Sequence, residues 1–244
     1  MELAHIVIFA FNRPKHLKIT VESLLRNKLS LESNVTVYCD GPRSQSDVSN
    51  VNLVRDFAKS IEGFKSLKII EHSSNKGLSK SIIDGVTESF NHYESLIILE
   101  DDLLVSDVFL DFMNSSLDLY KDDNDVASVH GYCYPIRGLP STFFIRGADC
   151  WGWATWKRSW LEFELDGKVL LKSILNRKLS FEFNLFGSYN YMKMLKNQIN
   201  NKNDSWAIRW HASNFLANKL TLYPGSSYVN NIGMDGTGTH FKSS

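Results

Sequence analysis

The sequence of 244 residues lacks several patterns that would place it in a common class of protein. Its three cysteines (Cys39, Cys133 and Cys150) form no Cys-x-x-Cys pair, which argues against a zinc ribbon and a disulfide framework. No stretch of 18 apolar residues occurs, so no membrane-spanning helix is expected. Neither a P-loop nor a Gly-x-Gly-x-x-Gly motif follows the first strand, which disfavours nucleotide triphosphatases and dinucleotide-dependent oxidoreductases.

A net charge is also absent, because 27 Lys and Arg balance 27 Asp and Glu. This balance argues against a nucleic-acid-binding protein that relies on bulk electrostatics. The balance conceals a division: residues 1–125 hold 13 basic and 20 acidic side chains, whereas residues 126–244 hold 14 and 7. All six tryptophans lie in the second half. We therefore expect the two halves of one fold to bind different ligands.

The length favours a single domain covering residues 1–244, with a nucleotide-sugar half (1–125) and an acceptor-side half (126–244). The first residues show neither the basic region nor the small-residue cleavage site of a signal peptide. The sequence therefore predicts a cytoplasmic protein.

Short apolar runs alternate with helical periodicity in the first half of the chain. The predicted strands cover residues 5–11, 35–39, 67–70 and 96–99. The predicted helices cover residues 14–25, 48–61, 78–90 and 109–119. This order predicts an α/β fold with a mostly parallel, Rossmann-like sheet flanked by helices. The second half is expected to be more helical, over residues 168–200 and after Asp204, with a short strand at 143–145 and a loop from 223 to 240.

Glu100-Asp101-Asp102 directly follows a buried apolar strand and is the sharpest local signal. Three adjacent carboxylates repel one another and need a compensating cation where they are buried. Mn²⁺ or Mg²⁺ prefers oxygen ligands and commonly bridges carboxylates and substrate phosphates. A solvated acidic turn, or a helix cap at Asp102, is the structural alternative.

Polar residues also follow the other predicted strands: Asn12 and Arg13 after the first, Asp40 after the second, and Asn75 and Lys76 after the third. Ligands of parallel sheets bind beyond the carboxyl ends of the strands, so these side chains are candidates for contact with a nucleotide. Each also has a structural interpretation, respectively as a helix cap, an Asx turn and a connecting loop.

Four motifs in order resemble nucleotide-sugar glycosyltransferases of the GT-A fold: Ile-Phe-Ala-Phe-Asn-Arg-Pro, Tyr-Cys-Asp-Gly, Asn-Lys-Gly-Leu and Ile-Leu-Glu-Asp-Asp-Leu. Within that group, the acidic triplet followed by Leu103, Val105 and Phe109 is similar to the motif of the N-acetylglucosaminyltransferase I family. Bacterial family 2-like sugar transferases are more similar in length. The resemblance covers most of residues 4–163.

The resemblance implies roles for the residues that match these motifs. Asp102 would bind the metal, with His240 as a second candidate ligand, Asp101 would lie near the ribose or the metal, and Glu100 near the donor sugar. Asn12, Arg13 and Asp40 would hold the nucleotide, with Asp40 near the base.

Two later segments also match. Trp151-Gly152-Trp153 resembles the aromatic segment that lines the sugar site, and its tryptophans flank a glycine as loop residues would. Asp204-Ser205-Trp206 resembles the segment that supplies the catalytic base of inverting members. Asp204 could equally cap the helix that follows it.

The activity that the resemblance implies is metal-dependent transfer of a sugar from a nucleotide diphosphate donor to a hydroxyl of a glycan or a lipid-linked glycan. The same resemblance favours UDP as the nucleotide of the donor and N-acetylglucosamine as the transferred sugar. No clear covalent nucleophile is present, which favours inversion with Asp204 as the base and Asp149 or Asp235 as competitors. The basic second half would suit a phosphate-bearing acceptor or peripheral association with the inner face of a membrane, although ordinary solvated lysines are the favoured explanation.

Two other functions are compatible with such a sheet. A sugar-phosphate nucleotidyltransferase needs a glycine-rich loop after the first strand, where this chain has Asn12-Arg13-Pro14. A non-catalytic sugar-nucleotide-binding subunit would not need the acidic triplet. The sequence gives no indication of the oligomeric state.

Overall fold

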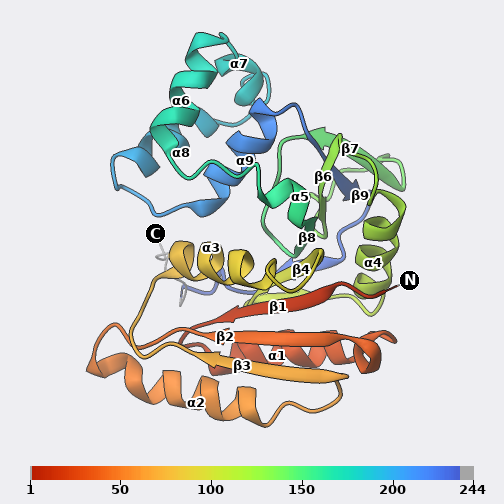
Figure 1. The fold of residues 1–244 in the computed structure, drawn as a ribbon, viewed down its shortest axis with the longest axis vertical. Helices are drawn as coiled ribbons and strands as arrows, with labels where there is room; N and C mark the ends of the chain where they lie inside the picture. The colour runs from red at the N-terminus through yellow and green to blue at the C-terminus, as the bar shows by residue number, and fades with distance from the viewer. Residues whose placement is uncertain (1, 237–244) are drawn as a thin grey trace.

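The computed structural model describes residues 2–236, which fold around an eight-stranded sheet flanked by helices (Figure 1). The strand order is β3-β2-β1-β4-β8-β6-β9-β7. The strands are β1 (His5–Ala10), β2 (Asn34–Cys39), β3 (Ser66–Glu71), β4 (Ser95–Glu100), β6 (Val126–His130), β7 (Thr142–Arg146), β8 (Trp153–Trp156) and β9 (Leu220–Pro224). A second, two-stranded sheet pairs β5 (Leu103–Val105) with β10 (Val229–Asn231).

The helices are α1 (Pro14–Leu25), α2 (Val48–Lys59), α3 (Leu78–Ser89), α4 (Phe109–Leu119), α5 (Lys157–Trp160), α6 (Gly167–Asn176), α7 (Ser180–Phe183), α8 (Tyr191–Ile199) and α9 (Trp206–Leu216). Helices α6 to α9 gather at the end of the molecule opposite α2 (Figure 1). Among residues 2–236, no helix is both long enough and apolar enough to span a membrane.

The predicted α/β fold class is confirmed, and the first half of the chain forms a run of four parallel strands, whereas the second half mixes one parallel pair, β6 with β9, with antiparallel pairs. Strands β3, β2, β1 and β4 all pair in parallel. Every residue of β1 is buried, as expected for a strand covered by helices on both faces. The second half joins this sheet through β8, which runs antiparallel to both β4 and β6.

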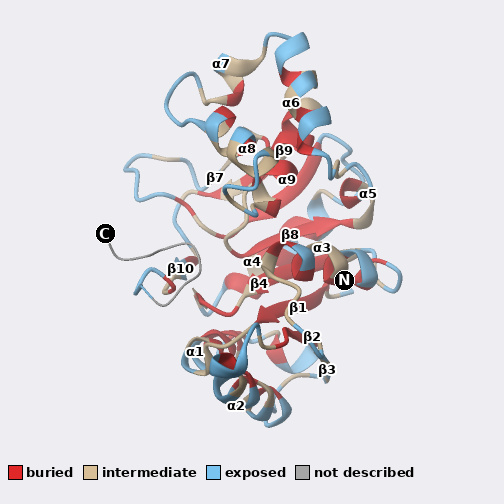
Figure 2. Ribbon diagram, turned by 90° about the vertical axis from the view of Figure 1, so that its left-hand side faces the viewer, coloured by how far each residue is buried: buried red, intermediate tan, exposed pale blue. Residues whose placement is uncertain are grey.

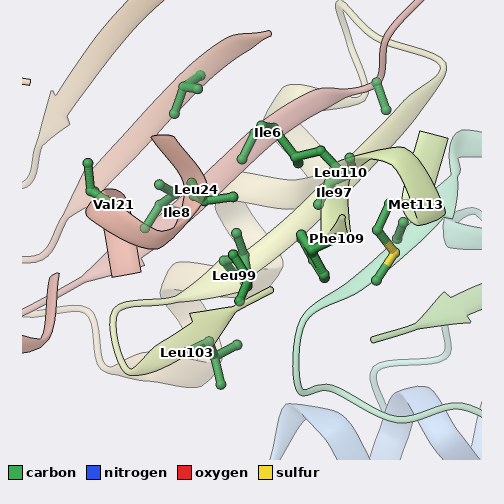
Figure 3. Close-up of a cluster of buried hydrophobic side chains, with 14 of the residues drawn as sticks. Ile6, Ile8, Val21, Leu24, Ile97, Leu99, Leu103, Phe109, Leu110 and Met113 are labelled. Atoms are coloured by element: carbon green, nitrogen blue, oxygen red, sulfur yellow. The ribbon is translucent and has the colours of Figure 1, made fainter. Parts of the chain in front are cut away.

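Two buried clusters fill the two faces of the sheet. On one face, α1 and α4 pack on β1 and β4 through Leu24, Ile8, Ile97 and Phe109 (Figure 3). On the other face, side chains of α3 pack in a cluster with four tryptophans, Trp153 of β8, Trp160 of α5, and Trp206 and Trp210 of α9. Figure 2 shows the resulting pattern, with buried strands and helices whose outer sides are exposed.

One prediction of local structure needs correction, and two are confirmed. Residues 168–200 are largely helical, as predicted, and form α6, α7 and α8, which are separated where Lys178, Leu185 and Phe186 adopt positive φ angles. The segment 223–240 is not all loop, because its residues 229–231 form β10 and pair with β5. The predicted strand at 143–145 is confirmed as the centre of β7.

Candidate active site

The acidic triplet lies at the carboxyl end of β4, where the neighbouring loop after β1 supplies a positive charge. Arg13 Nη2 donates to a carboxylate oxygen of Asp101 and to Asp102 Oδ2, the latter at 2.9 Å. Phe11 N also donates to Asp101 Oδ2, at 3.3 Å. Asp101 is 2% exposed and Asp102 8% exposed. One guanidinium therefore stands between two buried carboxylates.

One positive charge does not neutralise three carboxylates. Burial, followed by the charges of Asp102 and Asp101, raises the pKa of Glu100 to about 8. Burial raises the pKa of Asp101 to about 6, although Arg13 opposes this shift. Carboxyl groups that share a site with too little positive charge behave in this way. The end of β4 therefore favours a further cation.

The C-terminal strand closes over the triplet. Ile232 N donates to the carbonyl oxygen of Asp102 at 2.9 Å, directly after the pairing of β10 with β5. A side chain at Gly233 would place its Cβ 2.8 Å from Asp102 Cγ and 3.0 Å from Arg13 Nη1. Only glycine fits there without displacing the carboxylate.

Asp40 holds the loop that connects β3 to α3. Its Oδ1 accepts from Gly41 N and Lys76 N at 2.9 Å each, and its Oδ2 accepts from Asn75 Nδ2 at 2.9 Å and Gly77 N at 3.1 Å. The carboxylate is 5% exposed, so burial and four donors fix it in place. In the structure, Asp40 and Asn75 together shape the loop at the edge where β1, β2 and β4 end.

The other polar residues predicted at this edge have protein partners. Asn12 Nδ2 donates to Asp47 Oδ1 at 2.8 Å, and Lys76 Nζ donates to Asp84 Oδ2 at 3.0 Å. The Asn12 bond ties the end of β1 to the loop after β2, and the Lys76 bond ties the β3–α3 loop to its helix.

Asp204 is exposed and lies just before α9. The helix is capped by Ser205, whose side chain accepts from Ile208 N at 3.2 Å, so Asp204 is not the N-cap. A Cβ at Gly77 would lie 4.0 Å from Asp204 Oδ2. The carboxylate of Asp204 therefore faces the loop that Asp40 holds, free of any capping bond to the helix.

The segment 151–153 differs from the prediction of a loop that carries two tryptophans into the site. Trp153 is the first residue of β8, 1% exposed, and its ring stacks on Trp206 at 5.3 Å between centroids. Trp153 is therefore a core residue, and the prediction that it lies in a loop was wrong. Trp151 packs edge-on against Tyr132 at 4.8 Å. Gly152 turns the chain with φ +63°, and its Cβ would meet Val229 Cγ2 at 2.8 Å.

Residues 2–236 contain no group of three or more His, Cys, Asp or Glu arranged to enclose a metal ion. They do fit an ion held mainly by its substrate, which needs only one or two carboxylates from the protein. Asp102 Oδ1 is buried and has no hydrogen-bond partner. It is the oxygen that would bind such an ion. The second predicted ligand, His240, lies outside the described residues.

Sequence reasoning missed a second polar group, around Asp149. The ring of His130 is fully buried, and its Nε2 lies 3.6 Å from Asp149 Oδ2. No pattern in the sequence predicts this pair, because Asp149 precedes β8 and His130 ends β6, 19 positions earlier. Asp235, the other competing base, pairs instead with His16 Nε2 at 3.1 Å.

No family model matches the chain, and no curated protein matches it. Solved structures do. S. aureus TarS 1–349 aligns with a TM-score of 0.53 and 12% identity over 95% of this chain and 61% of its own length. A complex of TarS 1–349 with UDP-GlcNAc aligns with a TM-score of 0.40 and 14% identity, over 57% of this chain and 36% of that one. The mannosyltransferase PcManGT from Pyrobaculum calidifontis, in complex with GDP-Man and Mn²⁺, gives a TM-score of 0.40 and 14% identity over 55% and 36%.

This chain spans less than two thirds of the length of each of these structures. At 12% identity, the alignment with TarS 1–349 establishes the fold and nothing finer. The chain therefore has the fold of TarS 1–349 over nearly its whole length: an α/β fold with a large sheet flanked by helices.

Proposed function

We propose that this protein is a glycosyltransferase that uses a nucleotide-sugar donor and a divalent cation, Mn²⁺ or Mg²⁺. The observation that carries the proposal is the unpaired, buried Oδ1 of Asp102 at the end of β4, beside two further carboxylates and a single arginine. A diphosphate that brings its own cation would satisfy both this oxygen and the missing positive charge.

The cation, when bound, would neutralise the diphosphate and stabilise the charge that develops on the leaving group. Residues of the protein itself carry out the other tasks. Asp102 holds the cation, and Arg13 keeps the carboxylate oriented through its bond to Oδ2. Asp40 fixes the loop 75–77 that borders the nucleotide. We place the nucleotide half in residues 1–125 and the acceptor side in residues 126–244.

Asp204 is the proposed base that takes the proton from the acceptor hydroxyl. It lies next to Gly77, outside the group of carboxylates that shares the charge of Arg13, and it makes no capping bond. A carboxylate already neutralised by a cation is a poor proton acceptor, which favours Asp204 over Asp101 or Asp102. One base and no covalent nucleophile give inversion at the anomeric carbon.

The finer identity rests on resemblance. TarS 1–349 has been crystallised with UDP-GlcNAc, and the motifs resemble those of the N-acetylglucosaminyltransferase I family, so we propose a UDP-sugar donor and a hexose or N-acetylhexosamine as the transferred sugar. The acceptor would be a glycan or a lipid-linked glycan, reached in the cytoplasm or at the inner face of the membrane.

Thermal-shift measurements test the proposal. Tm is measured with Mn²⁺ alone, and with UDP-, GDP-, CDP- and dTDP-sugars, each in the presence and in the absence of Mn²⁺. We expect one nucleotide class to raise Tm only when Mn²⁺ is present, and Asp102→Asn to abolish the rise. Asp122→Asn, which changes an exposed carboxylate, is the matched control. Failure of every sugar nucleotide to stabilise the protein would remove the donor from the proposal.

A further inference from the structure

Asp149 stands at the centre of a polar group that the proposed donor site does not use. Its Oδ1 accepts from Cys150 N at 2.8 Å, and its Oδ2 faces His130 Nε2 at 3.6 Å. The side chain of Asp149 is 34% exposed, whereas that of His130 is 0% exposed. Neither ring nitrogen of His130 has a hydrogen-bond partner. A buried polar side chain without a partner is costly, so its place beside an accessible carboxylate indicates a site.

Tyrosines surround this pair in two arms, which we call the tyrosine cluster: Tyr132 and Tyr134, which follow β6, and Tyr189 and Tyr191, at the start of α8. The rings of the first arm lie 5.2 Å apart between centroids, and those of the second 4.6 Å apart. Tyr134 is 64% exposed and Tyr189 54% exposed, so each arm offers a free ring face to solvent.

Ring contacts place Asp149 between the arms. The ring of Tyr132 meets that of His130 edge-on at 6.3 Å between centroids, and the ring of Tyr191 stacks on that of His211 at 4.3 Å. His130 faces Asp149, and His211 contacts the backbone of Ala148, the residue before Asp149. Burial, and next the charge of Asp149, raises the pKa of Tyr134 and of Tyr191, in agreement with this position.

The backbone before Asp149 is held in place by α9. His211 Nδ1 lies 3.2 Å from the backbone nitrogen of Ala148 and 2.9 Å from its carbonyl oxygen, and it bonds to one or the other according to the tautomer of the ring. Gly147 has φ +108°, and its Cβ would lie 2.6 Å from His211 Nδ1, so only glycine allows this close approach. The carboxylate is thus presented by a fixed turn, which favours a binding role over that of a solvated side chain.

We propose that the tyrosine cluster and Asp149 bind an uncharged sugar unit of the acceptor. The C–H face of the sugar stacks on the exposed rings of Tyr134 and Tyr189, and one of its hydroxyls donates to Asp149. The inference rests on the proposed function, because it assigns the acceptor of that reaction. The charge at the centre of the cluster is negative, so a phosphate group is repelled there and a neutral or N-acetylated sugar is preferred.

Binding to an array of immobilised oligosaccharides tests this site without catalysis. The array carries neutral, N-acetylated and phosphate-bearing glycans, and the labelled protein is applied without donor. We expect neutral or N-acetylated glycans to bind, and Asp149→Asn and Tyr134→Ala to weaken binding about tenfold each. The matched controls are Asp118→Asn, on the surface of α4, and Phe144→Ala, an exposed aromatic on β7 outside the cluster. Both controls should bind as the unchanged protein does.

Donor binding is followed in parallel by thermal shift, and hydrolysis of the donor by water is followed as a catalytic readout that needs no glycan. Donor binding should stay within twofold in Asp149→Asn and Tyr134→Ala. If glycans bind through Asp149 but no sugar nucleotide binds, the sugar site stands and the proposed donor function is lost. The site is overturned if phosphate-bearing glycans alone bind, if no glycan binds, or if the cluster variants bind normally. A loss of hydrolysis in Asp149→Asn with intact glycan binding would also overturn it.

Discussion

Replacing Gly233 by alanine gives the most direct test of how the C-terminal strand shapes the acidic site. The new Cβ would lie 2.8 Å from Asp102 Cγ, whereas ordinary contacts begin at 3.4 Å, and its clash with Oδ2 is closer still. The carboxylate must therefore move by about 1 Å, a misplacement that can cost about 10²-fold in rate. Gly233 is outside the glycines with positive φ, so alanine adds a methyl group without backbone strain.

The expected result is a loss of Mn²⁺-dependent stabilisation by the donor, with far-ultraviolet circular dichroism unchanged. Isothermal titration with the sugar nucleotide that stabilises the unchanged protein measures the loss, which we expect to exceed tenfold in Kd. Asn230→Ala, an exposed position on β10, is the control. Normal titration of Gly233→Ala would show that the position of Asp102 is not what the donor requires, and the metal site would have to be abandoned.

Four further changes probe the site and the fold. Asp204→Asn should lower kcat by 10²–10⁴-fold, the range typical of a lost general base, with donor Kd unchanged; near-normal turnover would remove it as the base. Arg13→Gln leaves buried carboxylates unpaired and should cost about 3–5 kcal/mol in urea unfolding without metal; an unchanged midpoint would refute the pairing. Burial lowers the pKa of His5 to about 4, so its stabilisation is complete above pH 6.5 and is lost as pH falls through 4. The free energy of unfolding in urea, measured at pH 7 and at pH 4, should therefore fall by ~3 kcal/mol less in His5→Gln than in the unchanged protein. Trp153→Ala should cost about 3–5 kcal/mol, whereas a small loss would contradict its core position.

The first half of the fold was predictable because three of its four parallel strands, β1, β2 and β4, are almost entirely buried. The run from Ile6 to Ala10 is apolar throughout and lies in β1, and the apolar run before Glu100 lies in β4. A strand of this kind is recognised from its own apolar residues, so the local sequence is sufficient to predict it. The second half depends on long-range pairing. Strand β8 begins at Trp153, next to a glycine, and only its insertion between β4 and β6 makes it a strand.

The candidate site likewise has contacts that the sequence predicted and contacts that it did not. The meeting of Arg13 with Asp101 and Asp102 follows from the rule that parallel strands end at one edge, and the sequence predicted their common edge. It did not predict that Arg13 would stand between the two carboxylates. The packing of Gly233 against Asp102 and the pairing of His130 with Asp149 were not predicted either. Both join segments that are distant in the sequence, and no periodicity indicates such contacts.

The pairing of β10 with β5 has a consequence for the order in which the protein is made. The bond from Ile232 N to the carbonyl of Asp102 joins positions 130 residues apart in the chain. Residues 229–233 leave the ribosome after every strand of the large sheet has been synthesised. The sheet can therefore form while the acidic end of β4 is still uncovered, and its ligand site is completed last. A nascent chain stalled before residue 229 would leave the carbonyl oxygen of Asp102 without this bond and the acidic end of β4 without the cover of β10.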